Sequence, residues 1–247
     1  MSEENKLEVI FNGIRAFCEA NADEALVQKY SRYFTEGYDA YGLSKEVFLA
    51  QASDLAIELR EKLTLEESLR LGDLLFASGK YEEASFALRI TKAYESEFSP
   101  ATFQHIGEWF EEGVRNWGHT DVLCGEVLSI FFKKGICGLD DLATWRDSSS
   151  KWRRRAVPVS MIEFLDSELE MTSLLEFIDP MMMDEERFVH QGLGWFLREA
   201  WKRQPQPVES FLLKWKDTAP RKIFQYATEK MTKEQKTRFR AKRRTKK

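Results

Sequence analysis

Apolar residues along the chain recur mainly at helical spacing. Between positions 65 and 75, five leucines form a stripe of the kind that buries one face of a helix (Leu65, Leu69, Leu71, Leu74 and Leu75). Alternating runs of β-branched residues bounded by hairpin turns are absent, which disfavours α/β and all-β folds. The pattern predicts an all-α protein.

Helix starts can be placed from short polar signals. Thr64 with Glu67 three residues later is a capping box, in which each side chain satisfies a backbone N–H of the other residue. Ser99 before Pro100 combines an N-cap with a proline at the first helical position, where its missing N–H costs nothing. Asp184 is expected to open a further helix that ends before a proline.

Short polar breaks divide the chain into helices, and from about residue 98 onward they fit two-helix units of roughly 35–40 residues. That period is typical of HEAT-like solenoids. We therefore expect a single HEAT-like repeat domain over residues 1–235, an α-α superhelix. Its concave face would hold an extended partner.

The composition is that of a folded protein, and the charge is unevenly distributed along the chain. With 43% hydrophobic, 32% charged and 13% aromatic residues, the chain has the composition of a folded protein. From residue 221 onward, twelve Lys or Arg face two Glu, a net charge of +10, which leaves −14 on residues 1–220. A basic tail over 236–247 indicates a polyanionic partner, and a solvated disordered end is the alternative.

Several classes of protein are disfavoured. The longest apolar stretches fall far short of the roughly 20 residues that cross a bilayer, and the N-terminus is acidic where a secretory signal is basic. We expect a cytoplasmic protein with no membrane partner. The three cysteines are too irregularly spaced for a disulfide framework or a metal site, and they are expected to be buried thiols (Cys18, Cys124 and Cys137).

The segment "VRNWGHTD" holds Trp117, His119 and Asp121. The other histidines lie far away, without the spacing of metal ligands, so we expect no metal and no cofactor. If the chain becomes helical near His119, Asp121 lies close to a helix N-terminus. A capping or first-turn role is then its ordinary explanation.

A second cluster is "SSSKWRRRAVPV", in which Trp152 precedes Arg153, Arg154 and Arg155. Three consecutive arginines point in different directions around a helix, and Arg155, at i+3, is best placed to share a face with Trp152. The planar guanidinium suits phosphate because it donates two parallel hydrogen bonds. A solvated basic turn is the alternative.

The third cluster is "HQGLGWFLREAW". Gly192 and Gly194 each cost a helix about 1 kcal/mol relative to alanine, so we expect another group to approach the backbone closely there. Trp195 follows directly, and a core position is the ordinary explanation for a single helical indole.

Taken together, the order W-x-x-x-D, then W-x-x-R-A, then G-W-x-L-R-E resembles the AlkD-type alkylpurine DNA glycosylases. The similarity extends to "KYSRYFTEGYDAYGLSKEVF" and to the C-terminal "VESFLLKWKDTAPRKIFQYATEK", and covers roughly residues 25–235. The resemblance implies an all-helical HEAT-like solenoid that holds duplex DNA in a concave groove. It also implies release of 3-methyladenine or 7-methylguanine in base excision repair, by a protein expected to be monomeric.

The resemblance also implies roles for individual residues. Asp121 matches the catalytic carboxylate, Trp117 and Trp195 match the indoles around the sugar, and Arg155 matches the arginine that holds DNA. Trp152, Arg153 and Arg154 are expected to contribute to DNA binding beside it. A helical-repeat protein that binds damaged or branched DNA without excising bases is the first alternative, and a protein-interaction scaffold is the second.

Overall fold

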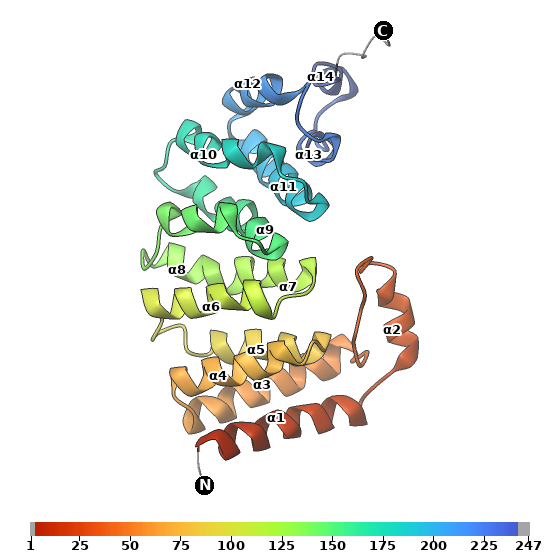
Figure 1. Cartoon of the computed structure of the whole chain (residues 1–247), viewed down its shortest axis with the longest axis vertical. Helices are drawn as coiled ribbons and strands as arrows, with labels where there is room; N and C mark the ends of the chain where they lie inside the picture. Colours follow the sequence, from red (N-terminus) through yellow and green to blue (C-terminus); the bar gives the residue numbers. More distant parts are fainter. Residues whose placement is uncertain (1–2, 242–247) are drawn as a thin grey trace. The chain divides into compact units, whose positions relative to one another are not determined.

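The computed structural model describes residues 3–241, and within this range every regular element is a helix and no strand is present (Figure 1). The all-α prediction is confirmed. In chain order the α-helices are α1 (Glu3–Ala20), α2 (Glu24–Ser31), α3 (Lys45–Lys62), α4 (Leu65–Ala77), α5 (Tyr81–Lys92), α6 (Pro100–Glu112), α7 (Trp117–Val122), α8 (Ser129–Lys133), α9 (Lys151–Ser160), α10 (Met171–Ile178), α11 (Arg187–Arg203), α12 (Pro205–Trp215), α13 (Arg221–Ala227) and α14 (Lys233–Thr237). A π-helix, η1 (Leu123–Leu128), and three 3-10 segments, η2 (Leu139–Asp147), η3 (Met161–Asp166) and η4 (Asp179–Met183), lie between them.

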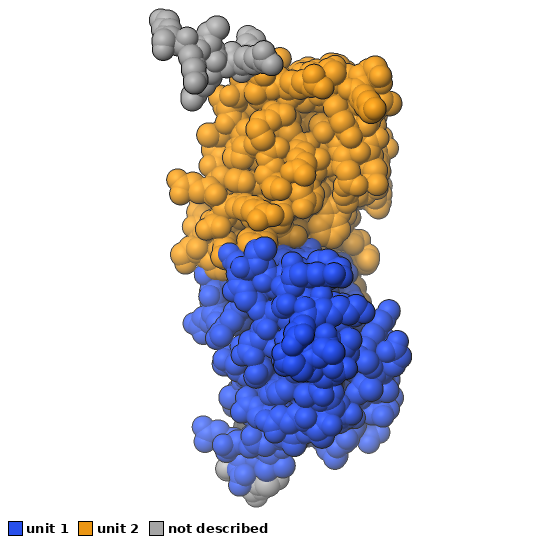
Figure 2. Space-filling view, turned by 90° about the vertical axis from the view of Figure 1, so that its right-hand side faces the viewer, with its two compact units in different colours: residues 1–131 blue, residues 132–247 orange. Residues whose placement is uncertain are grey.

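The chain divides into two compact units, residues 1–131 (unit 1) and residues 132–247 (unit 2), coloured separately in Figure 2. The boundary falls within α8. From α6 onward, helical units begin at Pro100, Leu139, Met171 and Pro205, at intervals of 39, 32 and 34 residues, of which the last two are shorter than the predicted 35–40. A single repeat domain over 1–235 stays a prediction, as does its concave groove.

Both predicted capping signals form. The Thr64 hydroxyl accepts a hydrogen bond from the Glu67 N–H at 3.2 Å, and the Glu67 carboxylate accepts one from the Thr64 N–H at 2.7 Å. Ser99 caps α6 in the same way, with Thr102 as its reciprocal partner. The leucine stripe of α4 is buried at Leu69, Leu71 and Leu75, whereas Leu74 is 41% exposed.

In unit 1, α5 packs against α3 and α4 and also holds the loop between α2 and α3. The buried Glu82 carboxylate, in the first turn of α5, accepts hydrogen bonds from the backbone N–H groups of Tyr41, Gly42 and Leu43 at 2.8–3.2 Å. Next to it, Glu83 accepts two hydrogen bonds from Arg15 and one from the Tyr41 hydroxyl. These acids therefore fix the loop between α2 and α3 on the helical stack.

In unit 2, α11 lies between α9 and α13, as Figure 1 shows. A Cβ atom at Gly194 would lie 2.5 Å from the Tyr226 Cβ and 2.7 Å from the Ile223 carbonyl oxygen of α13. At Gly192 a Cβ would lie 3.2–3.4 Å from atoms of Pro158 and Arg155 of α9. The predicted close approach to these glycines is confirmed, and the groups that approach are the neighbouring helices.

The predicted start of a helix at Asp184 is wrong by three residues. Helix α11 begins at Arg187, because Asp184 is held outside it. Its carboxylate accepts a hydrogen bond from the Glu186 N–H at 2.8 Å and pairs with the Arg154 guanidinium at 2.7 Å. A short aspartate side chain that bonds the backbone two residues on favours a turn over a helix.

The C-terminal end of the described chain is folded. Phe239 is buried, its carbonyl accepts a hydrogen bond from Arg221 at 2.9 Å, and Arg238 pairs with Glu209. Residues 242–247 of the predicted basic tail lie outside the described residues. No helix between residues 3 and 241 is both long and apolar enough to span a membrane.

Candidate functional site

Trp117 and Asp121 lie on the short helix α7 of unit 1. Its N-cap is Asn116, whose Oδ1 accepts a hydrogen bond from the His119 N–H at 2.8 Å, so Asp121 lies beyond the first turn. The expectation that Asp121 caps the helix is therefore wrong. At i and i+4, the indole and the carboxylate share one helix face with Cβ atoms about 5–6 Å apart, and both are half-buried.

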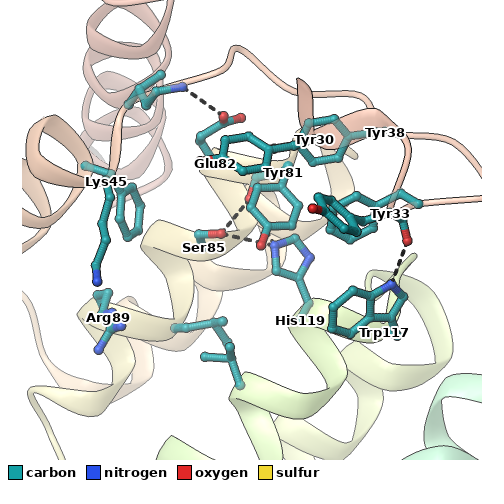
Figure 3. A pocket seen from close by; sticks show the side chains of 15 residues that line it. Tyr30, Tyr33, Tyr38, Lys45, Tyr81, Glu82, Ser85, Arg89, Trp117 and His119 are labelled. Carbon is teal, nitrogen blue, oxygen red and sulfur yellow. Dashed lines mark hydrogen bonds between the residues drawn. The ribbon is translucent and has the colours of Figure 1, made fainter. Parts of the chain in front are cut away.

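The Trp117 indole is fixed by contacts of its own. Its Nε1 donates a hydrogen bond to the Tyr33 carbonyl at 3.1 Å, as Figure 3 shows. Its ring stacks on Phe34 with 5.5 Å between centroids and 17° between planes. The indole is therefore held by the segment that follows α2, and one orientation of its face is favoured.

His119 is structural, as expected for a residue without metal-ligand neighbours. Because the Asn116 Oδ1 is occupied, its Nδ2 donates to the His119 Nδ1 at 3.0 Å, and the His119 Nε2 then donates to the Tyr81 carbonyl at 3.0 Å. Burial lowers the pKa of His119 to about 4. The imidazole is therefore neutral at pH 7.

The chain continues from α7 directly into the π-helix η1. Isolated π-turns in α-helices are frequent at functional sites. Glu126 of η1 accepts hydrogen bonds from Arg89 at 2.6 Å and Lys92 at 3.3 Å, both on α5. This acid joins the π-helix to the central helix of unit 1.

An aromatic cavity of about 520 Å³ lies beside Trp117 (Figure 3). The site prediction missed it, because its walls come from α2, the following loop, α3, α5 and α7. The sequence signal that indicates it is the density of aromatic residues between positions 30 and 41. The side chains that line the cavity include seven of Tyr, Phe or Trp and three that are charged, two cations and one carboxylate (Tyr30, Tyr33, Phe34, Tyr38, Lys45, Phe48, Tyr81, Glu82, Arg89 and Trp117).

In unit 2, Trp152 and Arg155 share the buried face of α9, as their i, i+3 spacing predicts. The Trp152 ring packs 4.9 Å from the Phe188 ring, and the Arg155 Nη1 donates to the Phe188 carbonyl at 2.6 Å. Arg155 is only 4% exposed. Its carbonyl and Cγ also lie against Gly192.

The other two arginines of the cluster point elsewhere. Arg154 binds the Asp184 carboxylate and donates to the carbonyls of Ser148 and Ser149 at 2.7 and 3.1 Å, which gives it a structural role. Arg153 is half-buried with its guanidinium 4.9 Å from the centre of the Trp145 ring. The expected contact of Arg153 with DNA stays a prediction.

Trp195 lies on the same face of α11 as Phe188 and Gly192, at i+7 and i+3 from them. It is half-buried, and its indole makes no hydrogen bond or ring contact with the part of the chain that the structure describes. Trp195 is therefore not a core residue, which was the ordinary explanation for a single helical indole. Packing of α11 on α9 thus brings Trp195 within one helical turn of the Arg155 contact.

The predicted residues are therefore brought together in two groups, Trp117 with Asp121 in unit 1, and Trp152, Arg155 and Trp195 in unit 2. That the two groups share one surface stays a prediction. Among residues 3–241, no group of three or more His, Cys, Asp or Glu is placed to hold a metal ion. Cys18, Cys124 and Cys137 are buried thiols.

A family model described as "DNA alkylation repair enzyme" matches residues 14–231. The chain belongs to this family. The match spans both units and all the residues of the two groups above. Membership places the protein among the enzymes of DNA alkylation repair, with DNA as its partner.

Solved structures show the same helical-repeat fold. A predicted DNA alkylation repair enzyme from Enterococcus faecalis is 16% identical, with a TM-score of 0.74 over 86% of this chain and 98% of its own. AlkD2 from Streptococcus mutans is 20% identical, with a TM-score of 0.56 over 73% of this chain and 88% of its own. The protein smu.31 from Streptococcus mutans UA159 is also 20% identical, with a TM-score of 0.58 over 75% and 94%. No curated protein matches the chain.

Proposed function

We propose that the protein is a DNA glycosylase that hydrolyses the N-glycosidic bond of N3- or N7-alkylated purines in duplex DNA. The observation that carries this proposal is the placement of Asp121. Asn116, and not Asp121, caps α7, and Asp121 shares a helix face with a fixed indole. A carboxylate beside an aromatic face is suited to stabilise a positive charge.

The chemistry of the lesion requires such a site. Alkylation at N3 or N7 gives the purine a positive charge, so the base leaves as a neutral molecule without prior protonation. The charge then develops on the sugar, as in the oxocarbenium-like transition states of glycoside hydrolysis. Preorganised negative charge and dipoles stabilise this state more strongly than water does.

Each candidate residue receives one role in this proposal. Asp121 opposes the charge that develops on the sugar and orients the attacking water. The Trp117 and Trp195 faces contact the sugar, where a cation over an aromatic ring is worth about 0.5–2 kcal/mol. Arg155 holds a phosphate; the residue is 4% exposed and its guanidinium donates to the Phe188 carbonyl, so this contact requires the side chain to turn outward when DNA binds. Trp152 positions Arg155, and Arg153 contacts the DNA backbone beside it.

The decisive experiment compares base release by the wild type and by Asp121→Asn from duplex DNA containing 7-methylguanine. We expect the substitution to lower the rate at least about 100-fold, the scale for removing one electrostatic stabiliser, with DNA affinity preserved. The matched control is Glu112→Gln, which removes one negative charge from an exposed position of the same unit. Release at the wild-type rate by Asp121→Asn would exclude the assigned role.

Discrimination by lesion charge provides a second readout. Uracil is neutral, and its release would need a proton donor that this mechanism does not contain. We expect purified protein to release 3-methyladenine or 7-methylguanine but not uracil. Tight, salt-sensitive binding of alkylated or branched DNA without release of any base would instead favour the non-catalytic alternative.

A further inference from the structure

The aromatic cavity of unit 1 has chemically distinct ends. Figure 3 shows Tyr30, Tyr38 and Tyr81 grouped at one end, with Trp117 beside them, and Lys45 and Arg89 together at the other. Its volume of about 520 Å³ lies within the range of roughly 300–1,000 Å³ that is typical of small-molecule sites. A ligand that fits both ends is flat and apolar on one side and anionic on the other.

The aromatic end offers faces for stacking. Phe34 is stacked between Tyr38, at 4.6 Å and 7°, and Trp117, at 5.5 Å and 17°, which holds these rings in place. Tyr30 and Tyr33 are 38% and 53% exposed, so much of their surface is open to a ligand. Rings held in this way present preformed platforms for a planar heterocycle.

The same end also offers hydrogen-bonding groups. The hydroxyls of Tyr30, Tyr38 and Tyr81 make no hydrogen bond to any residue that the structure describes. Burial raises the pKa of Tyr38 and of Tyr81, so both phenols stay neutral at pH 7 and can donate or accept. A nucleobase edge carries both kinds of partner.

The other end carries net positive charge. Lys45, the first residue of α3, is exposed and forms no ion pair within residues 3–241. Arg89 shares Glu126 with Lys92, so one carboxylate faces two cations there. The excess positive charge fits a phosphate, which arginine binds through paired donors and lysine as a point charge.

From this geometry we propose that the cavity binds one nucleotide displaced from the DNA, with its base among the tyrosines and its phosphate at Lys45 and Arg89. The inference rests on DNA as the partner of this family and does not require base excision. It adds a base-binding site to a protein whose proposed chemistry reads only the sugar and the phosphate. Charge complementarity favours a nucleotide over an uncharged aromatic ligand.

The test measures the affinity for an undamaged duplex with one unpaired nucleotide, 2-aminopurine, against the fully paired duplex of the same sequence. Stacking on one aromatic side chain raises affinity about 5- to 150-fold. We expect a preference of this size for the unpaired nucleotide and a change in 2-aminopurine fluorescence on binding. Absence of a preference in the wild type would overturn the proposal.

Variants locate the preference in the cavity. Tyr33→Ala and Lys45→Glu should each remove most of it, whereas Tyr33→Phe keeps the ring and should retain it. Lys62→Glu is the matched charge control, because it makes the same change at the opposite end of α3, about 25 Å away at 1.5 Å per residue. A preference that survives Tyr33→Ala combined with Lys45→Glu would place the nucleotide elsewhere.

Two further arms separate this proposal from its alternatives. Asp121→Asn should retain the preference for the unpaired nucleotide, so failure of the excision chemistry and failure of the cavity proposal are distinguishable. Deoxyadenosine monophosphate alone is the probe for a free nucleotide. Binding of this probe as tightly as the duplex with the unpaired base would show that the cavity serves a free nucleotide, and the DNA proposal would be wrong.

Discussion

The two units differ in which of their candidate side chains the fold holds in place. In unit 1 the indole is fixed, because Trp117 stacks on Phe34 and donates to the Tyr33 carbonyl. In unit 2 the charged group is fixed instead, because Arg155 is buried and donates to the Phe188 carbonyl. The Trp195 indole is half-buried and makes no ring contact with the rest of the described chain.

This difference shows how each helix array orients one group. Unit 1 orients an aromatic face with a loop segment that α5 acids hold in place. Unit 2 orients a guanidinium with the backbone of α11, which Gly192 allows to lie close to α9. A role for Trp117 therefore depends on local folding of unit 1, and a role for Arg155 depends on the packing of α9 on α11.

The largest expected effect is a loss of stability at low pH that comes from His119, the buried neutral histidine beside the aromatic cavity of unit 1. Between pH 6.5 and 4 the unfolded imidazole binds a proton while the folded one, with a pKa of about 4, does not. Stability therefore falls as the pH drops through this window, by about 3 kcal/mol in total. Urea unfolding at pH 7.5 and pH 4.5 measures the loss, and His119→Gln should flatten the pH dependence. If the free energy of unfolding of that variant depended on pH as in the wild type, another group would be responsible for the titration.

The next effect tests the helix contacts of unit 2. Gly194→Ala would place a methyl group 2.5 Å from the Tyr226 Cβ and against the Ile223 carbonyl, and overpacking of this kind costs about 2–3 kcal/mol. Gly192→Ala meets its neighbours at 3.2–3.4 Å and should cost less than about 1 kcal/mol, since alanine also favours the helix. Urea unfolding compares the two, and equal losses would contradict the close approach of α13.

The contrast between the two indoles predicts a split between stability and activity. Trp117→Ala loses a stacked pair and a hydrogen bond and should destabilise the protein by about 2 kcal/mol. Trp195→Ala should cost less than about 1 kcal/mol, because its indole has neither contact within the described chain. Both variants should slow base release. A Trp195→Ala protein with normal base release would remove Trp195 from the proposed site.

The smallest effect distinguishes the two neighbouring arginines. Arg153→Ala should reduce the slope of log affinity for DNA against log salt concentration by about 1, as the loss of one phosphate contact does. Arg154→Ala should leave that slope unchanged and lower the melting temperature, because it breaks the partly buried pair with Asp184. Affinity measured at low and at high salt separates the outcomes, and a reduced slope in Arg154→Ala would reverse the assignment.

Features set by local sequence were predictable. The caps at Thr64 and Ser99 depend on residues three positions apart, and the shared face of Trp152 and Arg155 depends on helical spacing alone. The start at Asp184 was predicted wrongly because its partner Arg154 lies thirty residues earlier in the chain. Local sequence spacing cannot indicate a pair between residues so far apart in the chain.

The aromatic cavity was not predictable for a related reason. Its rings come from positions 30–38, 48, 81 and 117, and only the packing of α3, α5 and α7 around the loop after α2 makes them neighbours. The glycines of α11 are an intermediate case, since their helix cost indicated a close approach without identifying the partner. Candidate residues can therefore be found from motifs, whereas the cavity beside them required the fold.

The π-helix that follows Asp121 has a consequence for how this segment tolerates change. A π-turn is equivalent to one residue inserted into an α-helix, and one residue corresponds to about 100° of rotation. Gly125 is exposed, and a Cβ atom added there would meet no other atom within 4 Å, so its deletion would return the segment to α-helical register. Either the carboxylate or the buried Val127 and Leu128 would then turn away from their present directions. The inserted residue therefore sets the angle about the helix axis between the acid and these core residues.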